Sequence, residues 1–258
     1  MKRESFGSRL GFILVSAGCA IGIGNVWKFP YICGAYGGAA FILIYLCFLV
    51  ILGIPVLVAE FAVGRGSHTS VAKCFDKLAP AGSCWKPLKF IGIIGCYMLM
   101  MFYTTVGGWM IYYCVKSLRG DFVGATPEAV TQSFSDMLGN APTMTLWMVI
   151  ICLIGFAVCF MGLQNGIEKI SKVMMSALLI IMVVLAVHSV MMDGAGEGIR
   201  FYLVPDFQKI KDAGIGNVVF AALSQSFFTL SIGIGAMLIF GSYLDRTRSL
   251  TGEAVNIT

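Results

Sequence analysis

Charged residues are scarce in this sequence, and histidine is almost absent. Of the 258 residues 12% are charged and 58% are hydrophobic, whereas a soluble domain usually carries about 25% charged residues. So much apolar surface cannot be buried in a soluble core, and the composition indicates a lipid environment. His68 lies in a polar stretch and His188 near the end of an apolar run, so we expect no histidine-bound metal. The Lys and Arg residues form no cluster, which argues against a nucleic-acid partner.

Catalytic motifs are also missing. The sequence shows no nucleophile–base pair and no zinc-type spacing of its nine cysteines, so we expect neither an enzyme nor an organic cofactor. Most of the cysteines stand inside apolar runs, where a thiol behaves as a small hydrophobic group. Cys74 and Cys84 are the pair in a polar stretch, and we expect that stretch to face a reducing compartment.

Apolar stretches long enough to cross a bilayer, for which about 20 residues are needed, recur along the chain. A single helix satisfies its own backbone hydrogen bonds in lipid, so we expect every span to be helical. The sequence therefore predicts an all-α membrane protein with one transmembrane domain over residues 1–258. The expected spans are residues 10–30, 39–63, 90–115, 143–163, 173–192 and 215–244.

The basic residues predict the orientation of these spans. Cytoplasmic loops of membrane proteins carry an excess of Lys and Arg. With the N-terminus in the cytoplasm, twice as many of the 18 basic residues lie inside as outside. Most acidic loop residues then lie outside, for example in the stretch from Asp121 to Pro142, which we expect to be an extracellular loop. We therefore expect a multi-pass protein of an inner membrane with a cytoplasmic N-terminus.

The first and sixth spans contain glycine and polar residues that disfavour a continuous helix. Gly18, Gly22 and Gly24 precede Asn25 in the first span, and residues 224–235 of the sixth span contain Ser, Gln, Thr and Gly. Glycine costs about 1 kcal/mol relative to alanine inside a helix, so we expect both helices to unwind there. Unwound backbone at membrane depth lines a cavity, where its carbonyls face a cation and its helix N-termini face an anion.

The two interruptions stand five spans apart, as expected if each opens a five-helix repeat. Such a pair of interrupted helices marks the binding site of a transporter. The alternative is close helix packing, because Gly18 and Gly22 also form a face of small residues. Asn25 and Thr229 favour the transporter interpretation, since a buried asparagine needs a partner or a cavity.

Several motifs resemble those of the neurotransmitter:sodium symporter family. The run RLGFIL at residues 9–14 and the run GIGNVWKFP at residues 22–30 resemble the first-helix signature of that family. The sequences GGAAF, GIP and EFAVGR between residues 37 and 65 look like its second helix. The run FFTLS at residues 227–231 looks like its sixth. The resemblance covers essentially the whole chain.

This resemblance implies a transporter fold of two inverted five-helix repeats. The chain would contain the first five-helix repeat plus helix six, with helices one and six broken. The resemblance also implies cotransport of Na⁺ with an amino acid or a related amine by alternating access. An amino acid would then be the substrate, Na⁺ the transported coupling ion, and the bacterial inner membrane the location.

The family's sodium ligands match residues of the two broken helices. The Ala20 carbonyl and the side chains of Asn25 and Thr229 match the first sodium site, and the carbonyls of Gly18 and Ile21 match the second. All of these ligands are oxygens, which a hard cation prefers. A substrate carboxylate would complete one Na⁺ shell, because each charge is costly to bury alone and less costly beside the other.

Residues of the family's substrate site match as well. The amides of Gly22 and Ile23 and the hydroxyl of Tyr103 match groups that hold the substrate carboxylate, next to Ala20 and Thr229. Positions that line the side-chain pocket match Leu99, Phe228, Ser231 and Ile234. An apolar pocket of this kind suits a large hydrophobic or aromatic side chain, while the identity of the substrate stays open.

Five residues match gating or supporting positions of the family. Arg3 and Phe6 match the arginine and the aromatic residue of the inner gate. Glu60 and Gln225 match polar residues that support the broken segment and the outer gate. Lys28 stands where the outer gate usually has arginine, so a bidentate pair with a carboxylate is lost.

The chain departs from the family pattern at Ser176, where many bacterial members have proline, and in length. The sodium ligands of the family's seventh and eighth helices are absent, so transport would require further C-terminal helices or a partner chain. Two alternatives stay open. One is a truncated half that only binds a membrane partner, and the other is an ion channel, although no re-entrant filter loop is evident.

Overall fold

A computed structural model describes residues 9–22, 24–245 and 248–258 of the chain. These residues form helices and connecting turns, with no β-strand among them, which confirms the all-α prediction. Their packing divides into two compact units, residues 1–92 with 163–258 and residues 93–162. The two units are described separately below.

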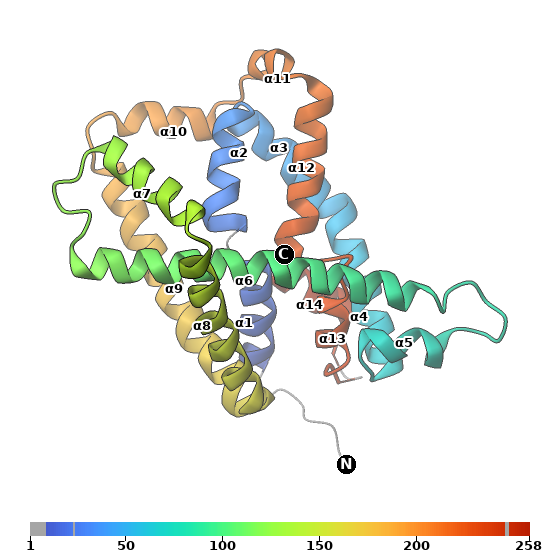
Figure 1. The fold of residues 1–258 in the computed structure, drawn as a ribbon. Helices are drawn as coiled ribbons and strands as arrows, with labels where there is room; N and C mark the ends of the chain where they lie inside the picture. Colours follow the sequence, from blue (N-terminus) through green and yellow to red (C-terminus); the bar gives the residue numbers. More distant parts are fainter. Residues whose placement is uncertain (1–8, 23, 246–247) are drawn as a thin grey trace. The chain divides into compact units, whose positions relative to one another are not determined.

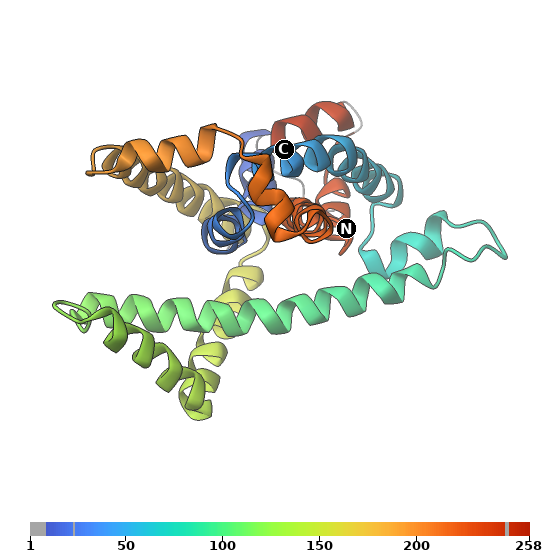
Figure 2. The same cartoon turned by 90° about the horizontal axis from the view of Figure 1, so that it is seen from above.

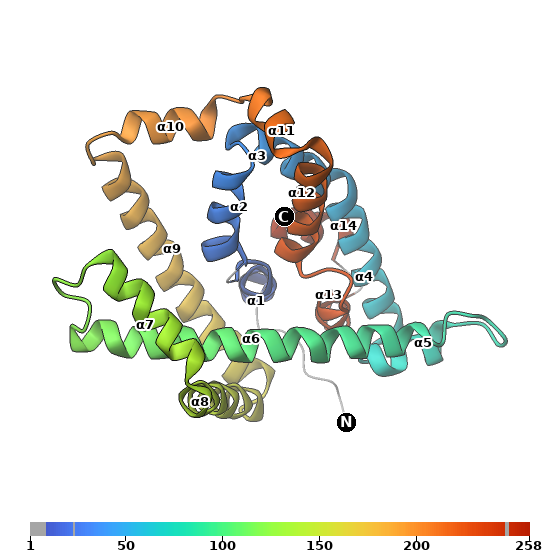
Figure 3. The same ribbon diagram turned by 45° about the horizontal axis from the view of Figure 1, so that its top comes forward.

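The first unit contains most of the helices (Figure 1). Its N-terminal elements are α1 (Arg9–Ala20), the π-helical turn η1 (Gly24–Lys28), α2 (Phe29–Ala35), α3 (Ala39–Phe48), the π-helical turn η2 (Leu49–Gly53), α4 (Ile54–Ser67) and α5 (Val71–Leu78). Its C-terminal elements are η3 (Leu163–Glu168), α9 (Lys169–Val190), α10 (Ala195–Leu203), α11 (Phe207–Ala213), α12 (Ile215–Leu230), α13 (Ala236–Gly241) and α14 (Leu250–Ile257). Figure 3 shows α10 and α11 connecting the end of α9 to the start of α12.

The α3, η2 and α4 elements form one 29-residue helix, Ala39–Ser67. A proline at position 55, in the first turn of α4, lacks an N–H group and cannot continue the regular hydrogen-bond ladder. The helical turn at this point contains one extra residue. The amide of Ile54 donates a hydrogen bond to the carbonyl of Leu49, which is the pattern of a π-helical turn. The expected second span therefore contains a π-helical turn at Leu49–Gly53.

The core of the first unit lies where α4 and α12 pack against their neighbours. Phe12 of α1 meets Phe61 of α4 with 5.9 Å between ring centroids, and both rings are fully buried. α13 lies along α4, and α12 lies along α3. A Cβ at Gly64 would collide with the Leu238 backbone, and one at Gly241 would lie 2.7 Å from Cα of Phe61. The two glycines therefore bring α4 and α13 into backbone contact.

Both helices that the sequence predicted to unwind are broken. The first leaves α-helical geometry after Ala20 and resumes as η1 at Gly24. The sixth leaves it after Leu230 and resumes as α13 at Ala236. Gly233 and Gly235 adopt φ values of 86° and 78°, which side chains disfavour, so glycine allows this turn.

Four helices of the described chain are long and apolar enough to cross a membrane: Ala39–Ser67, Leu88–Arg119, Ala141–Phe160 and Asn165–Val190. The number rises to six if each of two bent helix pairs counts as one span, the pair Gly11–Ala20 with Gly24–Ala35 and the pair Phe207–Ala213 with Ile215–Leu230. These helices overlap the expected spans, but the fifth begins at Asn165 instead of residue 173, and the sixth runs from Phe207 to Leu230 instead of from residue 215 to 244.

The second unit consists of most of α6 (Leu88–Arg119) with α7 (Pro127–Gly139) and α8 (Ala141–Phe160). Figure 2 shows α7 turning back beside the C-terminal end of α6. The stretch expected to be an extracellular loop thus contains a helix of its own. Its start is encoded locally, because the Thr126 side chain accepts a hydrogen bond from the Ala129 amide and proline follows at position 127.

Candidate functional site

The candidate site lies in the first unit, where the last turn of α12 passes the break between α1 and η1. Asn25 is the second residue of η1, directly after the break, and Thr229 stands in the last turn of α12. The hydroxyl of Thr229 donates to Oδ1 of Asn25 at 2.9 Å. Nδ2 of Asn25 in turn donates to the Ala20 carbonyl at 3.1 Å. Three of the predicted sodium ligands are therefore within hydrogen-bond reach of one another.

Two further side chains hold this group in place. Nε2 of Gln225, one turn before Thr229 on α12, lies 3.3 Å from the Gly24 carbonyl, 3.4 Å from Oγ1 of Thr229 and 3.5 Å from Oδ1 of Asn25. The hydroxyl of Tyr45, on α3, donates to Oγ1 of Thr229 at 3.1 Å. Gln225 is 1% exposed, and its Oε1 atom is buried without a hydrogen-bond partner among the described residues.

We call Ala20, Asn25, Tyr45, Gln225 and Thr229 the oxygen cluster. It offers a backbone carbonyl, two side-chain amide oxygens and two hydroxyls, and it contains no ionised side chain. Neutral oxygen donors held by fixed hydrogen bonds can replace part of the hydration shell of a monovalent cation at low cost in reorganisation. The cluster is therefore chemically suited to an alkali cation.

A second contact joins the two broken helices. Ser231, directly after α12, has φ of 51°, a left-handed conformation that is uncommon for residues other than glycine. Its hydroxyl donates to the Cys19 carbonyl, near the end of α1, at 2.9 Å. This bond satisfies a carbonyl that the end of α1 leaves without a helical partner.

The break between α12 and α13 is held from α4. Oε1 of Glu60 accepts a hydrogen bond from the Gly233 amide at 2.6 Å. The amides of Met237 and Leu238, in the first turn of α13, also lie close enough to interact with this carboxylate. A carboxylate at a helix N-terminus is stabilised by the unpaired amides and the helix dipole. Glu60 is therefore hydrogen-bonded to the segment between α12 and α13.

The other residues predicted for the site occupy several places. Gly18 and Ile21 line a separate cavity of about 620 Å³ between α1 and α9. Nζ of Lys28 lies 5.1 Å from the centre of the Phe228 ring, which also fills the space beside Gly24.

Gly22 is placed at the break itself, where its carbonyl accepts from the amides of Asn25 and Val26 at 3.0 and 3.3 Å. Ile234 lies in the second break, between Gly233 and Gly235. Leu99 and Tyr103 belong to the second unit, where Tyr103 packs edge-on against Phe102 at 5.7 Å. The predictions for Arg3, Phe6 and Ile23 fall outside the described residues.

Sequence reasoning missed Tyr45 and two buried acids. Tyr45 stands in an apolar run. A tyrosine hydroxyl that is buried needs a hydrogen-bond partner, and this requirement could have pointed to Tyr45. Glu168 and Glu253 are each 3% exposed, so Glu60 is not alone among acids placed within the helix bundle. Glu168 pairs with Lys172 at 2.8 Å and occupies the space beside Gly11, and Glu253 lies 3.7 Å from Arg248.

Comparison with known proteins decides the family. The profile of the sodium:neurotransmitter symporter family matches residues 3–130 and 128–258. The chain belongs to the sodium:neurotransmitter symporter family. Together with the apolar helices, this membership makes it a multi-pass membrane protein.

Relatives within the family come from bacteria and animals. The uncharacterized sodium-dependent transporter YhdH of Bacillus subtilis is 36% identical over 256 residues, which are 99% of this chain and 56% of that protein. The sodium- and chloride-dependent taurine transporter of Rattus norvegicus is 28% identical over 282 residues, with 94% and 44% covered. This family member thus spans about half the length of the relatives it matches.

A solved structure of the family extends the likeness to the fold. The crystal structure of MhsT in complex with L-phenylalanine matches with a TM-score of 0.88 and 37% identity, over 99% of this chain and 57% of MhsT. This match confirms the predicted transporter fold, with its first repeat and its broken helices one and six.

Proposed function

We propose that the protein takes part in sodium-coupled symport of an amino acid across the bacterial inner membrane by alternating access, with its N-terminus in the cytoplasm. The observation that carries this proposal is the hydrogen-bonded oxygen cluster at two broken helices. Asn25 and Thr229 are 204 residues apart in the sequence, and yet their side chains are hydrogen-bonded to each other. Family membership and the relatives named as sodium-dependent transporters support Na⁺ as the coupling ion.

In this proposal the Ala20 carbonyl, Asn25 and Thr229 bind one sodium ion, and the carbonyls of Gly18 and Ile21 contribute to a second. The substrate carboxylate lies against the amides of Gly22 and Ile23 and the hydroxyl of Tyr103. Sodium and carboxylate then neutralise each other in a site with little water, so each favours the binding of the other. Further helices or a partner chain supply the remaining sodium ligands.

The side-chain pocket is proposed to involve Leu99, Phe228, Ser231 and Ile234 and to accept a large hydrophobic or aromatic amino acid. MhsT, at 37% identity, was solved with L-phenylalanine, which agrees with an aromatic substrate. Lys28, beside Phe228, is proposed to belong to the outer gate with Gln225, and Arg3 and Phe6 to the inner gate. Glu60 holds the second break open to ligands through its bond to Gly233.

Uptake into proteoliposomes tests the proposal. With the protein expressed from its natural gene, radiolabelled L-phenylalanine should accumulate under an inward NaCl gradient and not when choline replaces Na⁺. Thr229→Val should abolish this uptake, whereas Thr131→Val, on the exposed face of α7, should leave it unchanged. Equal uptake in sodium and choline would refute the coupling, and ion conductance without substrate would favour a channel.

A further inference from the structure

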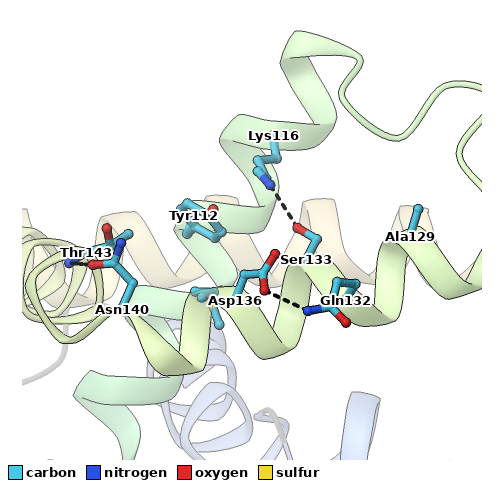
Figure 4. Close-up of a pocket in the computed structure, with 9 residues that line it drawn as sticks. Tyr112, Lys116, Ala129, Gln132, Ser133, Asp136, Asn140 and Thr143 are labelled. Carbon is cyan, nitrogen blue, oxygen red and sulfur yellow. Dashed lines mark hydrogen bonds between the residues drawn. The ribbon is translucent and has the colours of Figure 1, made fainter.

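The second unit contains a pocket of its own, formed by the end of α6, by α7 and by the first turn of α8 (Figure 4). Its volume is about 370 Å³, near the lower end of the range for small-molecule sites. The polar residues on its wall are Tyr112, Lys116, Gln132, Ser133, Asp136, Asn140 and Thr143. No member of this set was assigned to the sodium or substrate sites above.

The cationic side of this pocket is Lys116. Its Nζ atom donates to Oγ of Ser133 at 2.8 Å and lies 5.3 Å from the centre of the Tyr112 ring and 5.8 Å from that of Phe122. Within the part of the chain that the structure describes, no carboxylate lies within ion-pair distance of this ammonium group. Its neighbours are a hydroxyl and two aromatic faces, which attract a cation but carry no negative charge.

The anionic side of the pocket is Asp136, one turn beyond Gln132 on α7. Oδ1 of Asp136 accepts from Nε2 of Gln132 at 2.8 Å, and over the described ranges Asp136 forms no ion pair either. Figure 4 shows its carboxylate directed into the space beside Tyr112 and Ser133. One small cavity therefore presents a cation and a solvent-exposed anion that form no ion pair with each other.

Helix formation alone does not require these two charges. α7 is capped at its start by Thr126, and α8 by Asn140, whose Oδ1 atom accepts from the Thr143 amide at 3.1 Å. The walls are held by aromatic packing, with Trp109 edge-on to Phe134 at 5.8 Å. Lys116 and Asp136 thus project from a scaffold that is fixed by other contacts, as a binding site requires.

We propose that this pocket binds a free α-amino acid as a zwitterion. The ligand carboxylate binds Lys116 and the hydroxyl of Ser133, and the ligand ammonium group binds Asp136 beside the face of Tyr112. Both ends are needed, because each unpaired charge of the pocket is matched by one end of the ligand. This binding needs neither Na⁺ nor the broken helices, so it is independent of the symport proposed above.

Binding of L-leucine in sodium-free choline buffer, followed by saturation-transfer NMR on the detergent-solubilised protein, tests this site. Lys116→Gln and Asp136→Asn should each weaken binding at least about tenfold, the loss expected for one charged partner. The matched controls Arg119→Gln and Asp121→Asn remove the same charges just outside the pocket and should bind like the parent protein. Lys116→Arg should retain binding, which shows that the site is still folded.

Two ligand analogues and one variant of the oxygen cluster complete the test. L-leucinamide lacks the carboxylate, and N-acetyl-L-leucine lacks the ammonium group, so both should bind at least about tenfold more weakly than L-leucine. Asn25→Ala should leave sodium-free binding intact. Equal binding of either analogue overturns the zwitterion assignment, and loss of binding in Asn25→Ala with retention in Lys116→Gln overturns the location.

Discussion

The two helix breaks expose opposite ends of the peptide group. At the end of α1, side chains donate to carbonyls: Asn25 bonds the Ala20 carbonyl and Ser231 bonds the Cys19 carbonyl. At the start of α13 a carboxylate accepts from an amide, since Glu60 bonds the amide of Gly233. The first break therefore gathers oxygens, which suit a cation, whereas the second places backbone N–H groups against a carboxyl group. The comparison shows that the chemistry of a helix break depends on the side chains that bond its unpaired carbonyl and N–H groups.

Removing the charge at the second break should have the largest effect. Glu60→Ala leaves the Gly233 amide without its acceptor, and a bond to a charged group contributes roughly 1.5–3 kcal/mol. The free energy of unfolding should fall by about that amount, seen as a lower midpoint in thermal unfolding in detergent. Glu197→Ala, at an exposed acid of α10, is the matched control. Equal midpoints for the two variants would show that Glu60 does not hold the break.

Removing the amide at the first break should act on ion binding more than on stability. Asn25→Ala deletes one proposed sodium ligand and the donor to the Ala20 carbonyl. The Na⁺ concentration needed for half-maximal thermal stabilisation should rise at least about tenfold, because stabilisation follows the occupancy of the site. Asn217→Ala, on the exposed face of α12, should leave this concentration unchanged. An unchanged sodium response in Asn25→Ala would separate the oxygen cluster from ion binding.

Ser231 allows the bond between the breaks to be separated from backbone strain. Ser231→Ala loses the hydroxyl that bonds the Cys19 carbonyl and keeps a side chain at φ of 51°, so the free energy of unfolding should fall by about 1 kcal/mol. Ser231→Gly loses the same bond and tolerates this φ, so it should be more stable than Ser231→Ala. Chemical or thermal unfolding of both variants measures the order. The reverse order would show that the left-handed conformation is not strained.

The smallest effect concerns the packing of α5 beside the second break. Val71 fills the space next to Gly235, and Cys74 is buried against the same side of α13. Burial raises the pKa of the Cys74 thiol above its ordinary value, and its Sγ atom donates to the Val71 carbonyl at 3.3 Å. Because the thiolate is the reactive form, maleimide labelling of Cys74 should require higher pH than labelling of the exposed Cys84.

Mass spectrometry of peptides after timed labelling at several pH values resolves the two thiols. Glu60→Ala should speed the labelling of Cys74 modestly and leave Cys84 unaffected, since α5 packs on the segment that Glu60 holds. Equal labelling of both cysteines in the parent protein would contradict the buried position of Cys74.

The sequence predicted the features that local composition encodes. Glycine next to polar residues indicated where both helices unwind, and the resemblance to the family paired Asn25 with Thr229. Neither signal revealed the hydrogen bond from Tyr45 to Thr229, which are 184 residues apart. Because α3 is apolar on all sides, its sequence does not indicate which of its faces packs against α12. The burial of Glu168 likewise depends on the space left by Gly11 on another helix.

The π-helical turn and the helix caps were predicted less well than the breaks. The π-helical turn before Pro55 follows from a missing N–H group, yet a proline can also kink a helix or simply start one. α7 was overlooked because its polar composition was read as a loop, although Thr126 and Pro127 are typical of a helix start. Local signals of this kind identify where a helix begins, and hydropathy alone does not.

The backbone contact between α4 and α13 leaves no room for a side chain between these two helices. A Cβ at Gly64 would collide with the Leu238 backbone, and a Cβ at Gly241 would collide with the Phe61 backbone. A helix contact that relied on apolar side chains would tolerate exchanges of similar size, whereas this one tolerates no side chain at either position. Glycine therefore sets the distance between the two helices, and even alanine at either position would push them apart.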